Sequence, residues 1–185
     1  MPVATANQTI GPYWHLIEDP SWNDLTRFGA QGGAQGGAQG DVIGGVINLT
    51  GTITDGAGAL VADAAVEIWQ SSPDASDRFT GYGRTRTDDT GTFRFKTLKP
   101  GPVAGLGNAL QAPHVAITLH ARGLLHPLTT RLYFANEPLN ETDPVLSLIE
   151  DPAARQTLIA SPDGPSTWRL DIRLQGDNET VFMEF

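Results

Sequence analysis

The sequence contains no cysteine, and this absence excludes several kinds of chemistry. Disulfide bonds, zinc–thiolate sites and thiol nucleophiles all need a sulfur that the chain does not have. Basic residues are also scarce: 12 lysines and arginines stand against 21 aspartates and glutamates, a formal net charge of −9. An acidic chain is a poor match for nucleic acid or for an anionic membrane surface. We therefore expect neither as a partner.

Long hydrophobic runs are missing as well. No apolar stretch approaches the roughly 20 residues that a membrane-spanning helix needs. Residues 1–7 lack the basic start and the apolar segment of a signal peptide. We therefore expect a cytoplasmic protein. The chain has 185 residues, 39% of them hydrophobic, which is enough for one domain with its own core.

Alternation of apolar and polar residues begins at residue 46 and is the main structural signal. Turns rich in glycine, proline and aspartate separate the alternating segments, which is typical of an all-β antiparallel β-sandwich. Two short helices are expected after Asp143 and Asp151, because each places a capping carboxylate before a proline. The strands are expected at 46–53, 66–69, 92–96, 114–120, 130–134, 168–174 and 180–185.

The first 45 residues differ from the rest of the chain. Residues 1–20 are mixed in character and contain prolines, so we expect an N-terminal arm. Residues 29–40 repeat Gly-Ala-Gln-Gly, which supplies no side chains for a core. No Lys-Ser or Lys-Thr pair follows, so a surface loop is favoured over a phosphate-binding loop. We therefore divide the chain into an arm and glycine-rich loop, 1–45, and a β domain, 46–185.

Several short strings occur in the order and spacing of a known family, and together they cover nearly the whole chain except about residues 21–45. They are Thr9-Ile-Gly-Pro-Tyr13, Glu67-Ile-Trp-Gln70, Gly81-Tyr-Gly-Arg84, Lys99-Pro-Gly-Pro102, Ala112-Pro-His-Val-Ala-Ile117, Ala121-Arg-Gly123, Arg131-Leu-Tyr-Phe134 and Asp143-Pro-Val-Leu146. In these strings the sequence resembles the intradiol ring-cleaving dioxygenases. The resemblance implies a prealbumin-like sandwich of the intradiol dioxygenase type.

The resemblance also shows which metal ligands are missing. Catalytic members of the family bind Fe(III) through two tyrosines and two histidines; phenolates suit this hard cation. The family's His-x-His pair is here His114-Val-Ala116, and the tyrosine expected after Pro-Gly-Pro is Val103. No tyrosine occurs in 71–80, where the other should lie. We therefore expect no metal site in this chain, and a hydrogen-bonded structural role for His114.

By resemblance, the chain is an iron-free subunit of a hetero-oligomer whose β chain holds the Fe(III). The substrate pocket would lie between the two chains, and this chain would contribute no catalytic group. It would contribute Thr9, Gly11, Pro12 and Tyr13 of the arm, together with Arg122. A guanidinium can offer charge-assisted hydrogen bonds to the carboxylate of a catechol such as 3,4-dihydroxybenzoate. Dioxygen would then cleave the ring between the two hydroxyls, giving 3-carboxy-cis,cis-muconate.

Each of these assignments has a structural alternative. Arg122 could be solvated or make an ion pair, and Tyr13 could be only an interface anchor. Thr9 could be a turn hydroxyl, and the Gly11-Pro12 pair a simple bend.

The chain as a whole also has alternative functions. It could be a non-catalytic prealbumin-like binding or structural module, or a subunit of a dioxygenase for another catechol. The arm string and the string Asp171-Ile-Arg-Leu-Gln-Gly176 near the C-terminus favour the dioxygenase, because a generic sandwich module needs neither. Arg131 is expected to make a structural salt bridge, with Glu67 or Asp171 as the partner.

Overall fold

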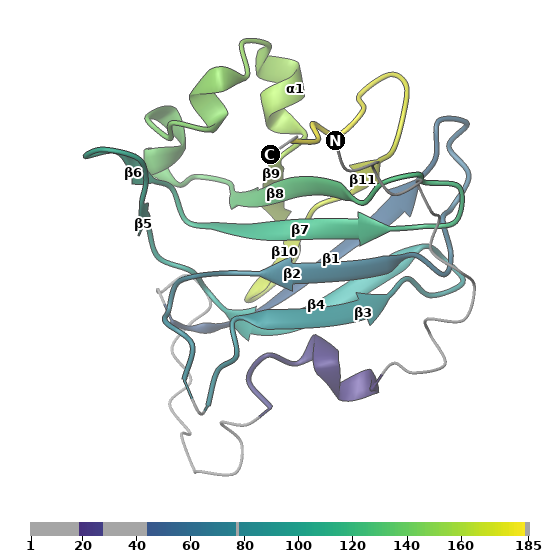
Figure 1. Ribbon diagram of the computed structural model, residues 1–185, viewed down its shortest axis with the longest axis horizontal. Coiled ribbons are helices and arrows are strands. Elements are labelled where there is room, and N and C mark those ends of the chain that lie inside the picture. Colours follow the sequence, from purple (N-terminus) through teal and green to yellow (C-terminus); the bar gives the residue numbers. More distant parts are fainter. Residues whose placement is uncertain (1–18, 28–43, 77, 184–185) are drawn as a thin grey trace, which may run out of the picture.

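The computed structural model describes residues 19–27, 44–76 and 78–183. Residues 1–18 of the predicted arm (1–20), including Thr9, Gly11, Pro12 and Tyr13, and the Gly-Ala-Gln-Gly repeat lie outside the described residues. The strands are β1 (Val46–Thr54), β2 (Ala65–Trp69), β3 (Tyr82–Arg86), β4 (Thr92–Leu98), β5 (Val103–Ala104), β6 (Leu110–Gln111), β7 (His114–His120), β8 (Leu128–Phe134), β9 (Ile159–Pro162), β10 (Thr167–Arg169) and β11 (Ile172–Arg173). The predominance of strands confirms the expectation of a mostly β chain (Figure 1).

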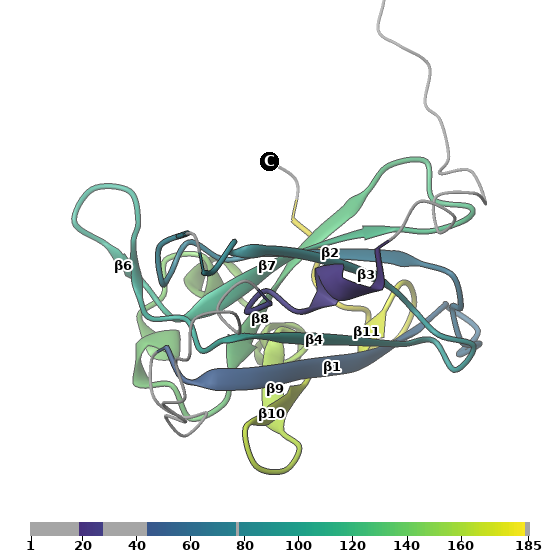
Figure 2. The same ribbon diagram turned by 90° about the horizontal axis from the view of Figure 1, so that it is seen from below.

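Nine of the strands form one continuous sheet in the order β11-β1-β10-β9-β8-β7-β2-β3, with β4 paired to β1. The sheet folds over itself, so that β2, β3 and β7 face β1 and β4 in two layers (Figure 2). Strands β8 and β9 pair in parallel and carry the sheet from one layer to the other. Two further pairs, β1–β10 and β1–β11, are also parallel. The sheet is therefore mixed, although most of its pairs are antiparallel.

Along β1, β4 and β7 every second residue is buried between the layers. The burial of β7 alternates strictly from His114 to His120, with the apolar positions inside. At Gly51 the strand passes so close to its neighbour that a Cβ would overlap the carbonyl oxygen of Leu170. The largest fully buried side chains include Ile47, Leu49, Phe93, Phe95, Ile117, Leu119, Leu132 and Phe134.

Strand β3 was not predicted, because its sequence shows no apolar alternation. Its inward position is Gly83, which leaves room for Leu25; a Cβ at Gly83 would overlap that leucine. Leu25 is fully buried and donates its backbone N–H to the carbonyl oxygen of Lys96 at 2.9 Å. It follows a short 3-10 turn, η2 (Pro20–Asn23), so the described residues 19–27 pack against β3 and β4.

The strand expected at 180–185 is not formed in its described part, residues 180–183. This segment is attached to β8 at single points. Met183 donates its backbone N–H to the Thr129 carbonyl at 2.8 Å, and the Thr130 hydroxyl donates to the Val181 carbonyl at 2.7 Å. Alternation alone therefore misassigned it, because a strand also requires a continuous ladder with a neighbour.

One of the two predicted helix caps forms as expected. The Asp151 carboxylate accepts the backbone N–H of Ala153 at 2.9 Å and begins α1 (Pro152–Gln156). After Asp143 the structure has a 3-10 turn, η5 (Leu146–Leu148), rather than an α-helix; its N-cap is Val145, and Asp143 accepts the N–H groups of Val145 and Leu146. A further 3-10 turn, η4 (Pro138–Glu141), precedes it. In the described part of the chain, no helix is long and apolar enough to cross a membrane.

Candidate functional site

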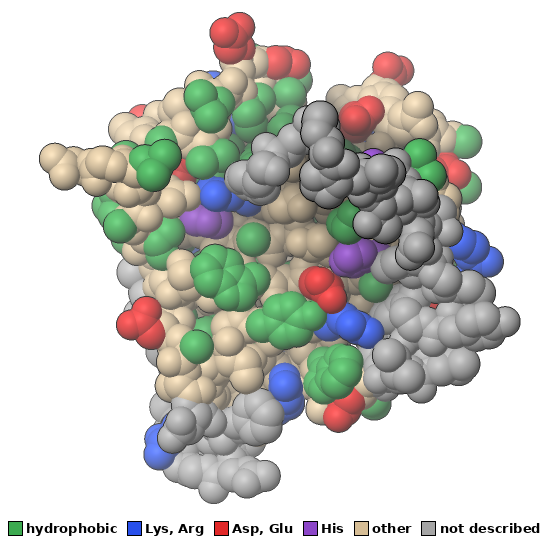
Figure 3. Space-filling view, viewed as in Figure 1, with side chains coloured by type: hydrophobic (Ala, Val, Ile, Leu, Met, Phe, Trp, Pro, Cys, Tyr) green, Lys and Arg blue, Asp and Glu red, His purple; other side chains and the backbone are tan. Residues whose placement is uncertain are grey.

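The outer face of β2, β3, β7 and β8 carries some of the side chains considered from the sequence, namely Glu67, His114, Ala116 and Arg131. On β7 the outward positions include His114, Ala116 and His120, all partly exposed. The register places Ala116 between Trp69 of β2 and Arg131 of β8. Aromatic, histidine, basic and acidic side chains lie side by side on this face (Figure 3). Residues from four separate segments thus form one surface.

The positions where the family places metal ligands also come together here. His114 and Ala116 lie on β7, and Val103 of β5 pairs with Gln111 of β6. The Gln111 side chain accepts a hydrogen bond from Arg131 Nη1 at 2.7 Å and donates one to the Ala104 carbonyl at 3.1 Å. Gln111 therefore joins the β5–β6 hairpin to β8 beside these positions.

The residues present at these positions do not fit a ferric ion. The side chains of Ala116 and Val103 have no atom that can bind a metal. Of the three positions, His114 alone therefore has a residue of a metal-binding type. Ala116 also faces Arg131 in register, and a fixed guanidinium opposes a second cation nearby. Across residues 19–27, 44–76 and 78–183 there is no cluster of three or more histidines or carboxylates able to hold a metal.

The His114 ring has a defined tautomer. Its Nδ1 lies 2.7 Å from the Ala112 carbonyl oxygen, which can only accept a hydrogen bond, so Nδ1 carries the proton. Nε2 is then an acceptor. Burial lowers the pKa of His114, and the nearby charge of Arg131 lowers it further. His114 is therefore a neutral imidazole, as the expected hydrogen-bonded role requires.

A buried carboxylate anchors this end of the face. Asp143 is fully buried and accepts the Ala112 N–H at 2.8 Å and the Tyr133 hydroxyl at 3.2 Å. Its Oδ1 also accepts the N–H groups of Val145 and Leu146, each at 2.8 Å. Burial raises the pKa of Tyr133 far above its usual value, so the phenol stays protonated and can donate. The Asp-Pro pair indicated only the cap; the other two contacts could not be predicted.

Arg131 does not make the expected salt bridge. Its Nη1 donates to Gln111 and, at 3.3 Å, to the Tyr133 hydroxyl. The two predicted partners are engaged elsewhere. Asp171 pairs with Arg169 at 2.7 Å, and Glu67 lies 3.7 Å from an arginine and 3.6 Å from a histidine. The prediction for Arg131 was wrong because sequence alone does not show the cross-strand register, which places Ala116 and Trp69, not Glu67, in line with Arg131.

Glu67 is the centre of a second polar group on the same face. It accepts the Tyr82 hydroxyl at 3.0 Å and lies close to Arg84 and His120. Trp69 is 54% exposed and Tyr82 is 43% exposed. Exposed aromatic residues beside an arginine are typical of the centres of protein interfaces.

Arg122 lies in the turn between β7 and β8. Its side chain is 72% exposed, and its Nη2 is 3.4 Å from Asp63 Oδ2. An ion pair so exposed to water contributes little stability. The exposed guanidinium fits both interpretations of Arg122, as a substrate-binding arginine and as a solvated or ion-paired surface arginine.

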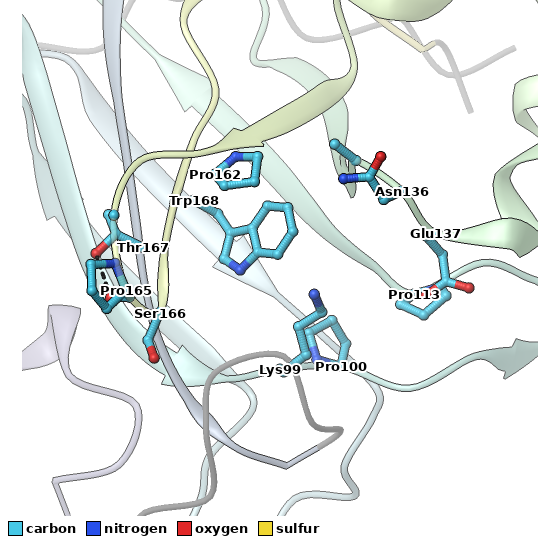
Figure 4. Close-up of a pocket in the computed structure, with 12 residues that line it drawn as sticks. Lys99, Pro100, Pro113, Asn136, Glu137, Pro162, Pro165, Ser166, Thr167 and Trp168 are labelled. Atoms are coloured by element: carbon cyan, nitrogen blue, oxygen red, sulfur yellow. Dashed lines mark hydrogen bonds between the residues drawn. The ribbon is translucent and has the colours of Figure 1, made fainter.

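The described residues also line a cavity of about 430 Å³ away from this face. Lys99, 7% exposed, projects into it, with Nζ 4.0 Å from the Trp168 ring centroid and 4.2 Å from that of Phe134 (Figure 4). Pro100, Pro113 and Pro162 form part of its wall. Arg122, the predicted site residue that lies in the described part of the chain, does not line it, and the ammonium is stabilised by the aromatic rings.

The comparison with known proteins agrees with this framework. Residues 17–176 match the family model described as dioxygenase. The chain belongs to this family, the intradiol ring-cleaving dioxygenases.

Individual relatives refine the family assignment. The chain is 38% identical to the protocatechuate 3,4-dioxygenase alpha chain of Pseudomonas putida, over 98% of this chain and 96% of that protein. It is 31% identical to the protocatechuate 3,4-dioxygenase beta chain of Burkholderia cepacia, over 72% of this chain and 66% of that one. The dioxygenase domain of a dioxygenase–carbohydrate-binding fusion from Streptomyces sp. SirexAA-E has a similar fold. The TM-score is 0.57 and the identity 24%, over 96% of this chain and 99% of that chain.

Proposed function

We propose that this chain is the iron-free α subunit of a protocatechuate 3,4-dioxygenase, completing a substrate pocket whose Fe(III) is held by a β chain. The main support for the proposal is the identity of the residues at the positions where the family places its iron ligands. The strand framework around Val103, His114 and Ala116 is intact, but two of these three residues cannot bind a metal. The chain matches an alpha chain over nearly its full length, at 38% identity, and also matches a beta chain. These two matches support a hetero-oligomer.

The same proposal covers the architecture. The two facing layers support a prealbumin-like β-sandwich of the intradiol dioxygenase type, residues 46–185, preceded by an arm and loop, 1–45. A cytoplasmic location stays a prediction from the sequence.

In this function the chain binds and orients the substrate. When bound in the partner, Fe(III) supplies the activation of the catechol toward dioxygen. Arg122 would hold the carboxylate of 3,4-dihydroxybenzoate through charge-assisted hydrogen bonds. Thr9, Gly11, Pro12 and Tyr13 would form a wall beside the flat ring and keep water away from it. The exposure of Arg122 supports this role, since its guanidinium is accessible to a ligand.

The subunit assignment is tested by co-purification. The chain is expressed alone, and together with an iron-bearing β chain from the same source. The chain alone is expected to contain no stoichiometric iron and no visible absorption band. The two chains together are expected to co-purify with one iron per pair. Iron bound by this chain alone would refute the ligand argument, and failure to bind the β chain would favour the non-catalytic binding module.

The role of Arg122 gives a separate prediction. In the assembled enzyme, Arg122→Ala is expected to raise KM for 3,4-dihydroxybenzoate about 10- to 100-fold, because charge-assisted hydrogen bonds contribute about 1.5–3 kcal/mol. The matched control is Asp63→Asn, which removes the ion pair but keeps the guanidinium. Steady-state kinetics should show little change for the control. Equal effects of both variants would assign Arg122 a structural role instead.

A further inference from the structure

Three side chains lie in one row across the outer face. Trp69 of β2, Ala116 of β7 and Arg131 of β8 are direct cross-strand neighbours. Adjacent strands lie about 4.8 Å apart, so the backbones on either side of Ala116 are separated by about 10 Å. The methyl group of Ala116 is much smaller than the indole and the guanidinium on either side, and we call this low position on the sheet surface the notch. Its floor is Ala116 and its two ends differ in chemistry, one aromatic and one cationic.

The Arg131 guanidinium is held in a fixed position with one edge free. Among the described residues, both of its hydrogen bonds use Nη1, to Gln111 and to Tyr133. Gln111 is itself anchored at its other end, and Tyr133 is fixed by the buried Asp143. Nη2 and Nε are left to donate to a ligand. This is the planar, two-donor arrangement that suits a carboxylate.

The charge of Arg131 is not cancelled by a direct ion pair within the described part of the chain. The carboxylates that face it from neighbouring elements are already in use. Asp143 accepts four hydrogen bonds and contacts Arg131 only through Tyr133. Glu67 on β2 is engaged by Arg84 and His120. The positive end of the notch therefore remains available to an anion.

His114 adds a neutral acceptor two residues along the same strand face. Its Nδ1–H donates to the Ala112 carbonyl, so Nε2 presents a lone pair. A ring hydroxyl of a ligand can donate to that nitrogen. Around Ala116 the surface therefore offers an aromatic wall, a carboxylate receptor and a hydroxyl acceptor.

We propose that this notch is a binding site for a small hydroxylated aromatic carboxylate. The carboxylate contacts Arg131, the ring lies over Ala116 with its edge toward Trp69, and a ring hydroxyl donates to His114. Binding is reversible, and no bond is made or broken. The guanidinium supplies a positive charge where the family's iron position has been lost. All the residues of the site lie on this chain.

The test measures binding of 4-hydroxybenzoate to the full chain by isothermal titration calorimetry, with uncharged 4-hydroxybenzyl alcohol as the comparison ligand. We expect one site per chain, and the alcohol to bind at least about tenfold more weakly, because it lacks the charge. Arg131→Gln should weaken 4-hydroxybenzoate binding by about tenfold or more. Ala116→Leu should weaken it similarly by filling the notch while leaving the Arg131 contacts in place.

The matched control is Arg94→Gln, since Arg94 is an exposed arginine on β4 in the other layer. It should leave the affinity unchanged, and circular dichroism checks that every variant is folded. Affinities unchanged in both Arg131→Gln and Ala116→Leu would overturn the proposal, as would no binding to the wild-type chain at about 10 mM. In the assembled enzyme the visible band reports the iron site separately. If Arg131→Gln or Ala116→Leu weakens 4-hydroxybenzoate binding without changing that band, the notch is a site separate from the iron site. The test of the notch is then independent of the test of the proposed subunit function.

Discussion

Oxygen uptake with 3,4-dihydroxybenzoate is expected from the assembled chains and not from this chain alone. By the resemblance, two ligand positions hold Ala116 and Val103, whose side chains have no donor atoms, so our proposal assigns the metal chemistry to the β chain. A pocket formed between two chains also lacks a wall when either chain is missing. We therefore expect activity at least about 1,000-fold higher for the mixture than for this chain by itself, because orientation and activation are both absent from the single chain.

The measurement is the initial rate in an oxygen electrode with three samples: this chain, the β chain, and both together. The β chain alone is the essential control, because it carries the iron in the proposal. Its activity should rise when this chain is added and should saturate at equal molar amounts. Full activity of the β chain without this chain would remove the pocket-completing role, even if the two chains co-purify.

Asp143→Ala is expected to destabilise the protein by about 3–5 kcal/mol, the cost typical of removing one partner from a buried polar network. The fully buried carboxylate accepts the N–H groups of Ala112, Val145 and Leu146 and the hydroxyl of Tyr133. Alanine leaves all four donors without that acceptor, and those of Ala112, Tyr133 and Leu146 belong to buried residues. Losses of this size approach the whole stability of many domains, so a large fraction of the variant should be unfolded at 37 °C.

Urea unfolding followed by tryptophan fluorescence measures this loss, with Asp151→Ala as the matched control. Asp151 is also a capping aspartate before a proline, but it is exposed and accepts the N–H of Ala153. Its replacement should cost about 1 kcal/mol, the usual value of a cap. If the two variants lose similar amounts, Asp143 is only a cap, and its contacts with Ala112 and Tyr133 contribute little.

The two capping aspartates show how far local sequence carries a prediction. Each was predicted from a carboxylate beside a proline; Asp151 caps α1 as expected, whereas Asp143 binds the N–H groups of Val145 and Leu146 at a 3-10 turn whose N-cap is Val145. The sequence does not distinguish the exposed cap from the buried one. That difference comes from β7 and β8, which bring Ala112 and Tyr133 to Asp143 from 31 and 10 residues away. Burial and long-range partners depend on how strands pair, which local patterns do not specify.

Arg131 and the C-terminal segment show the same limit. The sequence offered Glu67 and Asp171 as partners for Arg131, but the contacts formed are with Gln111 and Tyr133. Residues 180–183 alternate like a strand, yet they touch β8 only at separate points. In both cases the sequence shows the chemistry of the residues, but the strand register determines which residues they contact.

The sequence by itself determined the mostly β character of the chain and its family, and it predicts the loss of iron ligands. An alanine or valine side chain cannot bind a metal in any fold, so that prediction rests on Ala116 and Val103 and needs no structure. Tertiary structure alone decided that Trp69, Ala116 and Arg131 form one row. It also oriented His114 and left one edge of Arg131 free. The physical reason is that cross-strand register sets which distant side chains meet, whereas hydrophobic periodicity records only which face each residue occupies.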